Sequence, residues 1–168
     1  MMLGCAASAA IAQAPRPAAD ALVVPLTEQA KWQVLQYSRL PPHRIRFSGA
    51  GLEMGVDSSA MPLIHPLPRT VRVTGFRVKG RIEGTLRVPA DRQGEENFDD
   101  YTFRLGLVEP GERSLNFLQR QFAASWVRKL FELAPKGGGI SRIHFFNLGT
   151  HEKQIGRQRQ HPLSDLIL

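Results

Sequence analysis

Short runs in which apolar and polar residues alternate, each ended by glycine or proline, constrain the fold of this chain most. Alternation of this kind places one set of side chains on each face of a β-strand. Residues 44–48 and 52–56 alternate in this way around the Gly-Ala-Gly turn at 49–51, and this arrangement predicts a β-hairpin. The side chains expected to face inward are Ile45, Phe47, Leu52, Met54 and Val56.

The same pattern predicts further strands along the chain. Residues 70–88 keep a two-residue period, and a shift of one residue at Thr74-Gly75 predicts a β-bulge. Residues 101–108 predict a central strand, because the second face of this run is also partly apolar. Residues 140–148 predict another strand, and the polar stretch around Ile155 predicts an edge strand.

One helix is expected among these strands. Apolar residues recur near a 3.6-residue period through residues 115–134, with Ser114 as a possible N-cap and Pro135 after the end. Strands that do not alternate regularly with helices argue against a doubly wound α/β fold. We therefore expect a mainly-β domain: an antiparallel β-sandwich of jelly-roll, or galactose-binding-like, type, with one inserted or packed α-helix near 114–134.

The first residues are typical of an export signal. Residues 1–14 carry no charge and end on Ala-Gln-Ala, the small-x-small form that signal peptidase accepts. No Lys or Arg precedes the apolar stretch, and an Ala-rich tail is the alternative interpretation. We expect a signal peptide at 1–14, a lead-in segment at 15–39, and a single sandwich domain at 40–168. Cleavage after Ala14 would also remove the single cysteine, Cys5, which suits an oxidising periplasmic or extracellular location.

Composition limits the classes of protein that fit. The 42% of apolar residues and 22% of charged residues exclude a wholly disordered chain. A single cysteine excludes an intrachain disulfide framework and any cysteine-based zinc site. No apolar run reaches the length of a membrane-spanning helix, so we do not expect an integral membrane protein after signal cleavage.

Charge is unevenly distributed over the chain. The net charge is +7, but residues 39–92 hold ten cations and four acids, whereas residues 93–112 hold one cation and six acids. A basic surface favours anionic partners, and a simple bias toward arginine on solvated faces is the alternative. No block of Lys and Arg is long enough for a nucleic-acid arm, so we expect no nucleic-acid partner. The cationic side chains on the wet face of the 70–88 run are Arg77, Lys79, Arg81 and Arg87.

A six-position motif lies where the acidic stretch meets the next strand. The sequence Asp99-Asp100-Tyr101-x-x-Arg104 follows a long basic run and precedes a partly helical segment and a late strand. This order resembles an uncharacterised, domain-of-unknown-function family of secreted bacterial proteins that look like the jelly-roll sandwiches of carbohydrate-binding modules. The resemblance implies a fold and an exported location, and it implies no catalytic residue.

The two aspartates of this motif have three possible roles. One of them can pair with Arg104, or with the basic run at Arg77 and Arg81. Carboxylate oxygens at a strand start can also ligate Ca²⁺, although no acidic calcium-binding loop is present. A glycosidase would need two facing carboxylates, which could come from Asp99, Asp100, Glu53 and Glu83.

Other candidate chemistry is sparse. The histidines do not show the spacing of a helical zinc pair, no Gly-x-Ser-x-Gly motif occurs, and we expect neither a metal site nor a cofactor. The sequence assigns no residue of this chain a catalytic role. Trp32 and Tyr37 can stack on sugar rings if they are exposed, because the apolar faces of sugars pack on aromatic planes.

Three functions follow from these observations. The first is a non-catalytic exported protein that binds an envelope glycan or anionic polymer through the cationic face. The second is an envelope hydrolase that cleaves polysaccharide with paired carboxylates. The third, a cytosolic nucleic-acid-binding protein, requires the export signal to be absent.

Overall fold

The mainly-β prediction is confirmed. Strand is more than twice as common as helix in the computed structural model, 24% against 10%. The structure describes residues 21–37, 39–89, 91–116, 121, 123, 125–134 and 138–160, except the side chains of 125 and 126. The expected signal peptide at 1–14 lies outside the described residues.

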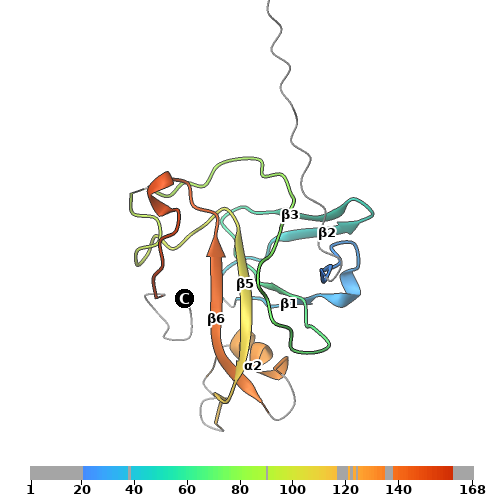
Figure 1. The fold of residues 1–168 in the computed structure, drawn as a ribbon. Coiled ribbons are helices and arrows are strands. Elements are labelled where there is room, and N and C mark those ends of the chain that lie inside the picture. The colour runs from blue at the N-terminus through green and yellow to red at the C-terminus, as the bar shows by residue number, and fades with distance from the viewer. Residues whose placement is uncertain are drawn as a thin grey trace, which may run out of the picture.

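The described strands form three antiparallel pairs (Figure 1). The short β1 (Gln33–Val34) follows the 3₁₀ turn η1 (Gln29–Lys31) and pairs with β4 (Leu63–Ile64). The hairpin consists of β2 (Arg44–Ser48) and β3 (Gly51–Gly55). The longest pair joins β5 (Arg104–Gly111) to β6 (Gly139–Asn147). The jelly-roll sandwich therefore stays a prediction.

The predicted hairpin is confirmed, with a shorter turn. Ser48 pairs with Gly51, so the turn is only Gly49-Ala50, the length that antiparallel strands most often use. Ile45 and Phe47 are half-buried, as the alternation predicts, and so is Leu52. Met54 and Val56 are exposed, so their inward assignment is wrong. No residue of β2 or β3 belongs to the buried cluster of the described chain, and the inner face of the hairpin is thus only partly covered.

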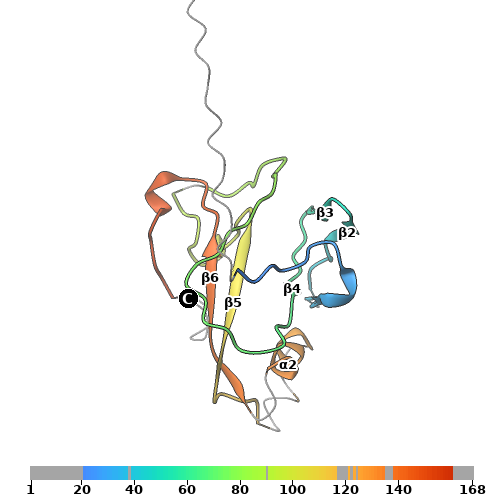
Figure 2. The same cartoon turned by 45° about the vertical axis from the view of Figure 1, so that its right-hand side comes forward.

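The β5–β6 pair carries the core on one face. Ile140 and Ile143 of β6 are buried together with Leu35 and with Leu130 of the helix α2 (Ser125–Glu132). In both Figure 1 and Figure 2, α2 lies near the lower end of this ribbon and the β2–β3 hairpin lies to one side. Within the described chain β5 pairs with β6 alone, so the prediction of a central strand at 101–108 is wrong.

The helix predicted through 115–134 is confirmed in part, because residue 121 is helical and α2 spans Ser125–Glu132. Residues 113–116 are not helical, and the described part of α2 starts at Ser125. The carbonyl of Arg113 accepts a hydrogen bond from the backbone N–H of Ile140 at 3.0 Å. Residue 113 is therefore held beside the first residues of β6, and the helix does not begin directly after Ser114.

Two predicted strands do not form. The described residues of 65–103 contain no strand, and both the long basic strand at 70–88 and its bulge at Thr74-Gly75 are wrong. Around Ile155 the chain forms a 3₁₀ turn, η2 (Glu152–Gln154), in which His151 Nδ1 accepts from the backbone N–H of Lys153. Alternation states which side chains share a face, but a strand also needs a neighbouring strand to accept its hydrogen bonds.

Candidate functional site

The basic segment at 69–88 forms an exposed arm. This basic arm holds six cationic side chains and one carboxylate, Glu83, which is a net charge of +5. Its green trace passes beside β5 in Figure 1 and across the front of the β5–β6 ribbon in Figure 2. The Phe76 ring meets the Phe146 ring of β6 edge-on, with 4.7 Å between centroids, and this contact holds the arm against the ribbon.

The four cations predicted as binding residues all lie on the arm and are all exposed. They are Arg77, Lys79, Arg81 and Arg87. Arg81 forms an ion pair with Glu83 at 2.9 Å, and both side chains are more than 70% exposed, so water and salt screen this pair strongly. Alternate residues of an extended chain are about 7 Å apart. Arg77, Lys79 and Arg81 occupy such alternate positions and offer a row of positive charge.

Asp99 lies in a separate cluster and is held by two arginines. Its carboxylate accepts from Arg104 Nη2 at 3.0 Å and from Arg159 Nη2, and the Asp99 side chain is only 18% exposed. The predicted pairing of a motif aspartate with Arg104 is therefore confirmed. Both carboxylate oxygens face guanidinium groups, an arrangement that favours an ion pair over a calcium ligand.

Arg104 is fixed by several groups at once. Its guanidinium also donates to the Asp99 carbonyl and to Asn147 Oδ1, each at 2.8 Å. It lies over the ring of Phe145 at 4.8 Å and over that of Tyr101 at 5.1 Å, distances typical of cation–π contacts. The motif thus builds a rigid junction between the start of β5 and the end of β6.

A buried glutamine extends this junction to the chain after β6. Gln93 is 3% exposed, and its Nε2 donates to the Asp100 carbonyl at 2.8 Å. Its Oε1 accepts from the backbone N–H and from Oγ1 of Thr150, each at 3.0 Å. The Gln93 carbonyl in turn accepts from Gln154 Nε2 at 3.3 Å. Asp100 itself is exposed and contributes to this network through its backbone.

The two aromatic residues predicted as sugar platforms lie in different places. Tyr37 is half-buried near the Arg104 guanidinium: burial raises the pKa of its hydroxyl, and the positive charge of Arg104 opposes this rise. Trp32 is half-buried as well, and its indole N–H donates to the Pro25 carbonyl at 2.8 Å.

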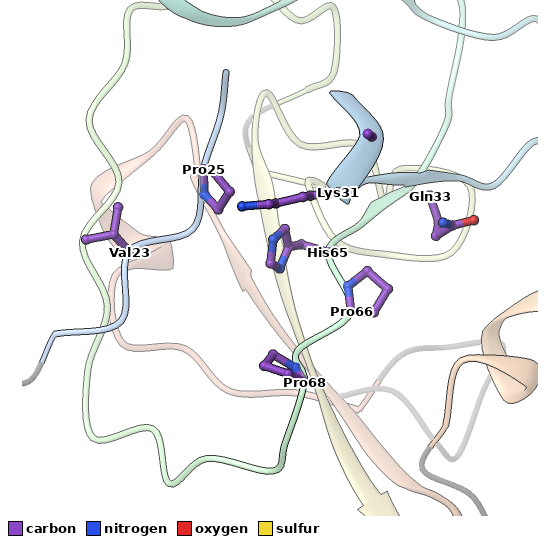
Figure 3. A pocket seen from close by; sticks show the side chains of 8 residues that line it. Val23, Pro25, Lys31, Gln33, His65, Pro66 and Pro68 are labelled. Carbon is purple, nitrogen blue, oxygen red and sulfur yellow. The ribbon is translucent and has the colours of Figure 1, made fainter. Parts of the chain in front are cut away.

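Trp32 supports one wall of a shallow pocket. The ring of His65 meets the Trp32 ring edge-on at 5.3 Å. Figure 3 shows the His65 ring between the Lys31 side chain and Pro66, and the pocket in front of it has a volume of about 400 Å³. The eight lining residues are Val23, Pro25, Ala30, Lys31, Gln33, His65, Pro66 and Pro68. None of them is an acid, a serine, a threonine or a cysteine, so these walls supply no carboxylate and no hydroxyl or thiol nucleophile.

Three of the four carboxylates predicted for a hydrolase pair with arginine, and the fourth, Asp100, is exposed. Glu53 pairs with Arg46 across the β2–β3 hairpin, Glu83 pairs with Arg81, and Asp99 pairs with two arginines. His144 Nε2 lies 3.0 Å from Glu109 on the β5–β6 ribbon. Among the described residues, no three or more His, Cys, Asp or Glu side chains gather closely enough to hold a metal ion.

Sequence reasoning missed four residues of these sites. Gln93, Asn147, Arg159 and His65 carry no motif, and only the fold brings them to their partners. Arg159 lies 60 positions after Asp99, so no local pattern could have joined the two.

Comparison with known proteins adds no relative. No protein-family model, curated protein or solved structure matches this chain. The resemblance to secreted jelly-roll proteins therefore stays a prediction. No helix in the part of the chain that the structure describes is both long and apolar enough to pass through a lipid bilayer.

Proposed function

We propose that this protein is a non-catalytic binding protein for an anionic polymer or glycan of the bacterial cell envelope. The observation that supports this proposal is the exposure of Arg77, Lys79, Arg81 and Arg87 on one arm with a net charge of +5. A row of solvated cations attracts a polyanion and releases the counterions of that polymer on binding.

The engagement of the carboxylates favours binding over hydrolysis. General acid–base catalysis on a sugar needs two carboxyl groups that face a substrate cleft. Three of the four candidate carboxylates, Glu53, Glu83 and Asp99, each pair with an arginine, whereas Asp100 is exposed. The pocket beside Trp32 is lined without any acid. We retain export to the periplasm or exterior, and a jelly-roll relationship, as parts of the proposal, supported by the leader-like residues 1–14 and by the strand-rich fold.

Charge reversal on the arm tests the proposal. Retention of the purified protein on beads that carry polygalacturonate is measured over a salt series. The Arg81→Glu/Arg87→Glu double variant is expected to lose about tenfold or more in affinity at low salt and to show a shallower salt dependence. The Arg39→Glu/Arg157→Glu variant changes net charge equally at two exposed positions off the arm and serves as the control.

Two results would contradict the proposal. Equal losses in both double variants would mean that only net charge matters and that the arm is no specific surface. Absence of retention at low salt on polygalacturonate, on inorganic polyphosphate and on peptidoglycan would remove anionic polymers as ligands. Trp32→Ala, measured in the same assay, tests whether the predicted stacking contributes a salt-insensitive part.

A further inference from the structure

The basic arm exposes apolar side chains as well as cations. Phe76, Val78 and Ile82 are 48–50% exposed, although each belongs to a residue type that usually lies inside a protein. These three residues occupy even positions, whereas Arg77, Lys79 and Arg81 occupy the odd positions between them. In an extended chain the two sets point to opposite sides, so the arm has an apolar edge and a cationic edge.

The apolar edge continues onto the β5–β6 ribbon. The Phe76 ring contacts the Phe146 ring, and the strand register places Leu105 opposite Phe146. The backbone N–H of Leu148 donates to the Phe103 carbonyl at 2.9 Å, which extends the same side of the ribbon by one more pair. The apolar patch is defined by six residues that are each at least 38% exposed: Phe76, Val78, Ile82, Phe103, Phe146 and Leu148.

An exposed apolar patch of this size marks an interaction surface, and its surroundings decide the partner. A hydrophilic polyanion would satisfy the cations and leave the apolar patch in water. A second copy of this chain in a two-fold dimer would cover the patch, but it would also bring like-charged arms together. A lipid layer with anionic headgroups satisfies both sets when the arm lies at the boundary of that layer. The apolar edge then faces the acyl chains and the cationic edge lies among the headgroups.

We infer that the basic arm and the apolar patch together bind the surface of an anionic lipid layer. The apolar side chains enter the boundary between headgroups and acyl chains, while Arg77, Lys79, Arg81 and Arg87 contact the headgroups. This inference rests on the proposed function, because the same cations bind the anion in both. It adds that the anionic groups belong to a lipid layer with an apolar interior and not to a free polymer.

Vesicle sedimentation, combined with retention on polyphosphate, distinguishes the lipid inference from the proposed function. The protein is mixed with vesicles of phosphatidylcholine alone and with vesicles that also contain phosphatidylglycerol, and the same preparations are tested on polyphosphate beads. The wild-type protein is expected to bind the anionic vesicles and not the neutral ones. The Val78→Ser/Ile82→Ser variant keeps every charge and is expected to lose about tenfold or more in vesicle partitioning, with polyphosphate retention unchanged.

The matched control is Val56→Ser/Ile155→Ser, which removes two exposed apolar side chains outside the arm and is expected to bind vesicles as the wild type does. Vesicle binding that is equal in the two serine variants would overturn the lipid inference. Retention on polyphosphate without vesicle binding would also overturn it and leave the proposed function intact. Absence of vesicle binding by the wild type, together with absence of retention on all three anionic polymers, would overturn both the lipid inference and the proposed function. A dimer in analytical ultracentrifugation that dissociates in Val78→Ser/Ile82→Ser would assign the patch to a second copy and overturn the lipid surface.

Discussion

Gln93 is the position at which a single substitution tests the Asp99 region most directly. The side chain makes three hydrogen bonds, one to the Asp100 carbonyl and two from Thr150, all between 2.8 and 3.0 Å. Each such bond contributes about 1 kcal/mol net to folding stability. Gln93→Ala removes all three, so the free energy of unfolding is expected to fall by about 2–4 kcal/mol. Since a domain of this kind is stable by only about 5–15 kcal/mol, the loss is a large share of the total.

Urea unfolding followed by circular dichroism measures this loss. The midpoint is expected to move to lower urea with an unchanged slope, because the same surface is exposed on unfolding. Gln158→Ala is the matched control: the same change at an exposed glutamine is expected to stay within about 0.5 kcal/mol of the wild type. A Gln93→Ala protein as stable as this control would show that the three bonds do not hold the 91–100 loop to the chain after β6.

Three further substitutions probe other local features. Gly94 has φ +96°, and a Cβ there would lie 2.5 Å from the Tyr101 hydroxyl, so Gly94→Ala is expected to cost about 1–3 kcal/mol in the same urea assay. Both ring nitrogens of His65 are buried without a hydrogen-bond partner among the described residues, so His65→Phe is expected to raise stability by about 1–3 kcal/mol. A lower melting temperature for His65→Phe would refute this reasoning. Burial lowers the pKa of His43 below its usual 6.5, and the unfolded chain therefore binds the proton more readily than the folded protein. Stability from this residue is present above pH 6.5 and is lost as the pH falls below that value, so His43→Gln is expected to unfold with a weaker pH dependence on that side, measured by urea titrations at several pH values.

Local sequence patterns predicted the structure correctly where the interacting residues are close to one another in the chain. The hairpin needs only a tight turn and two alternating runs, and its strands pair with the register that Ser48 and Gly51 define. The run at 140–148 became β6, with Ile143 buried as its alternation predicts. The ion pair between Asp99 and Arg104 spans five residues and was also visible in the motif.

Local sequence patterns did not predict the features that depend on residues far apart in the chain. The run at 70–88 has a two-residue period, but no neighbouring strand in the described chain accepts its backbone hydrogen bonds, and it remains an exposed arm. The 3.6-residue period at 115–134 does not reveal that residues 115 and 116 are not helical, or that the Arg113 carbonyl accepts a hydrogen bond from the backbone of Ile140. Gln93 is buried only because Thr150, 57 positions later, lies beside it.

The sequence alone was enough to predict the β2–β3 hairpin, the strand β6 and the strongly basic character of residues 69–88. It did so because alternation, turn residues and charge are properties of neighbours along the chain. The fold decides which runs pair with another strand and which acid pairs with which arginine. It also places the Phe76 ring of the arm against Phe146 of β6. Burial and hydrogen bonding are shared between segments far apart in sequence, and each segment's final state depends on what the rest of the fold brings to it.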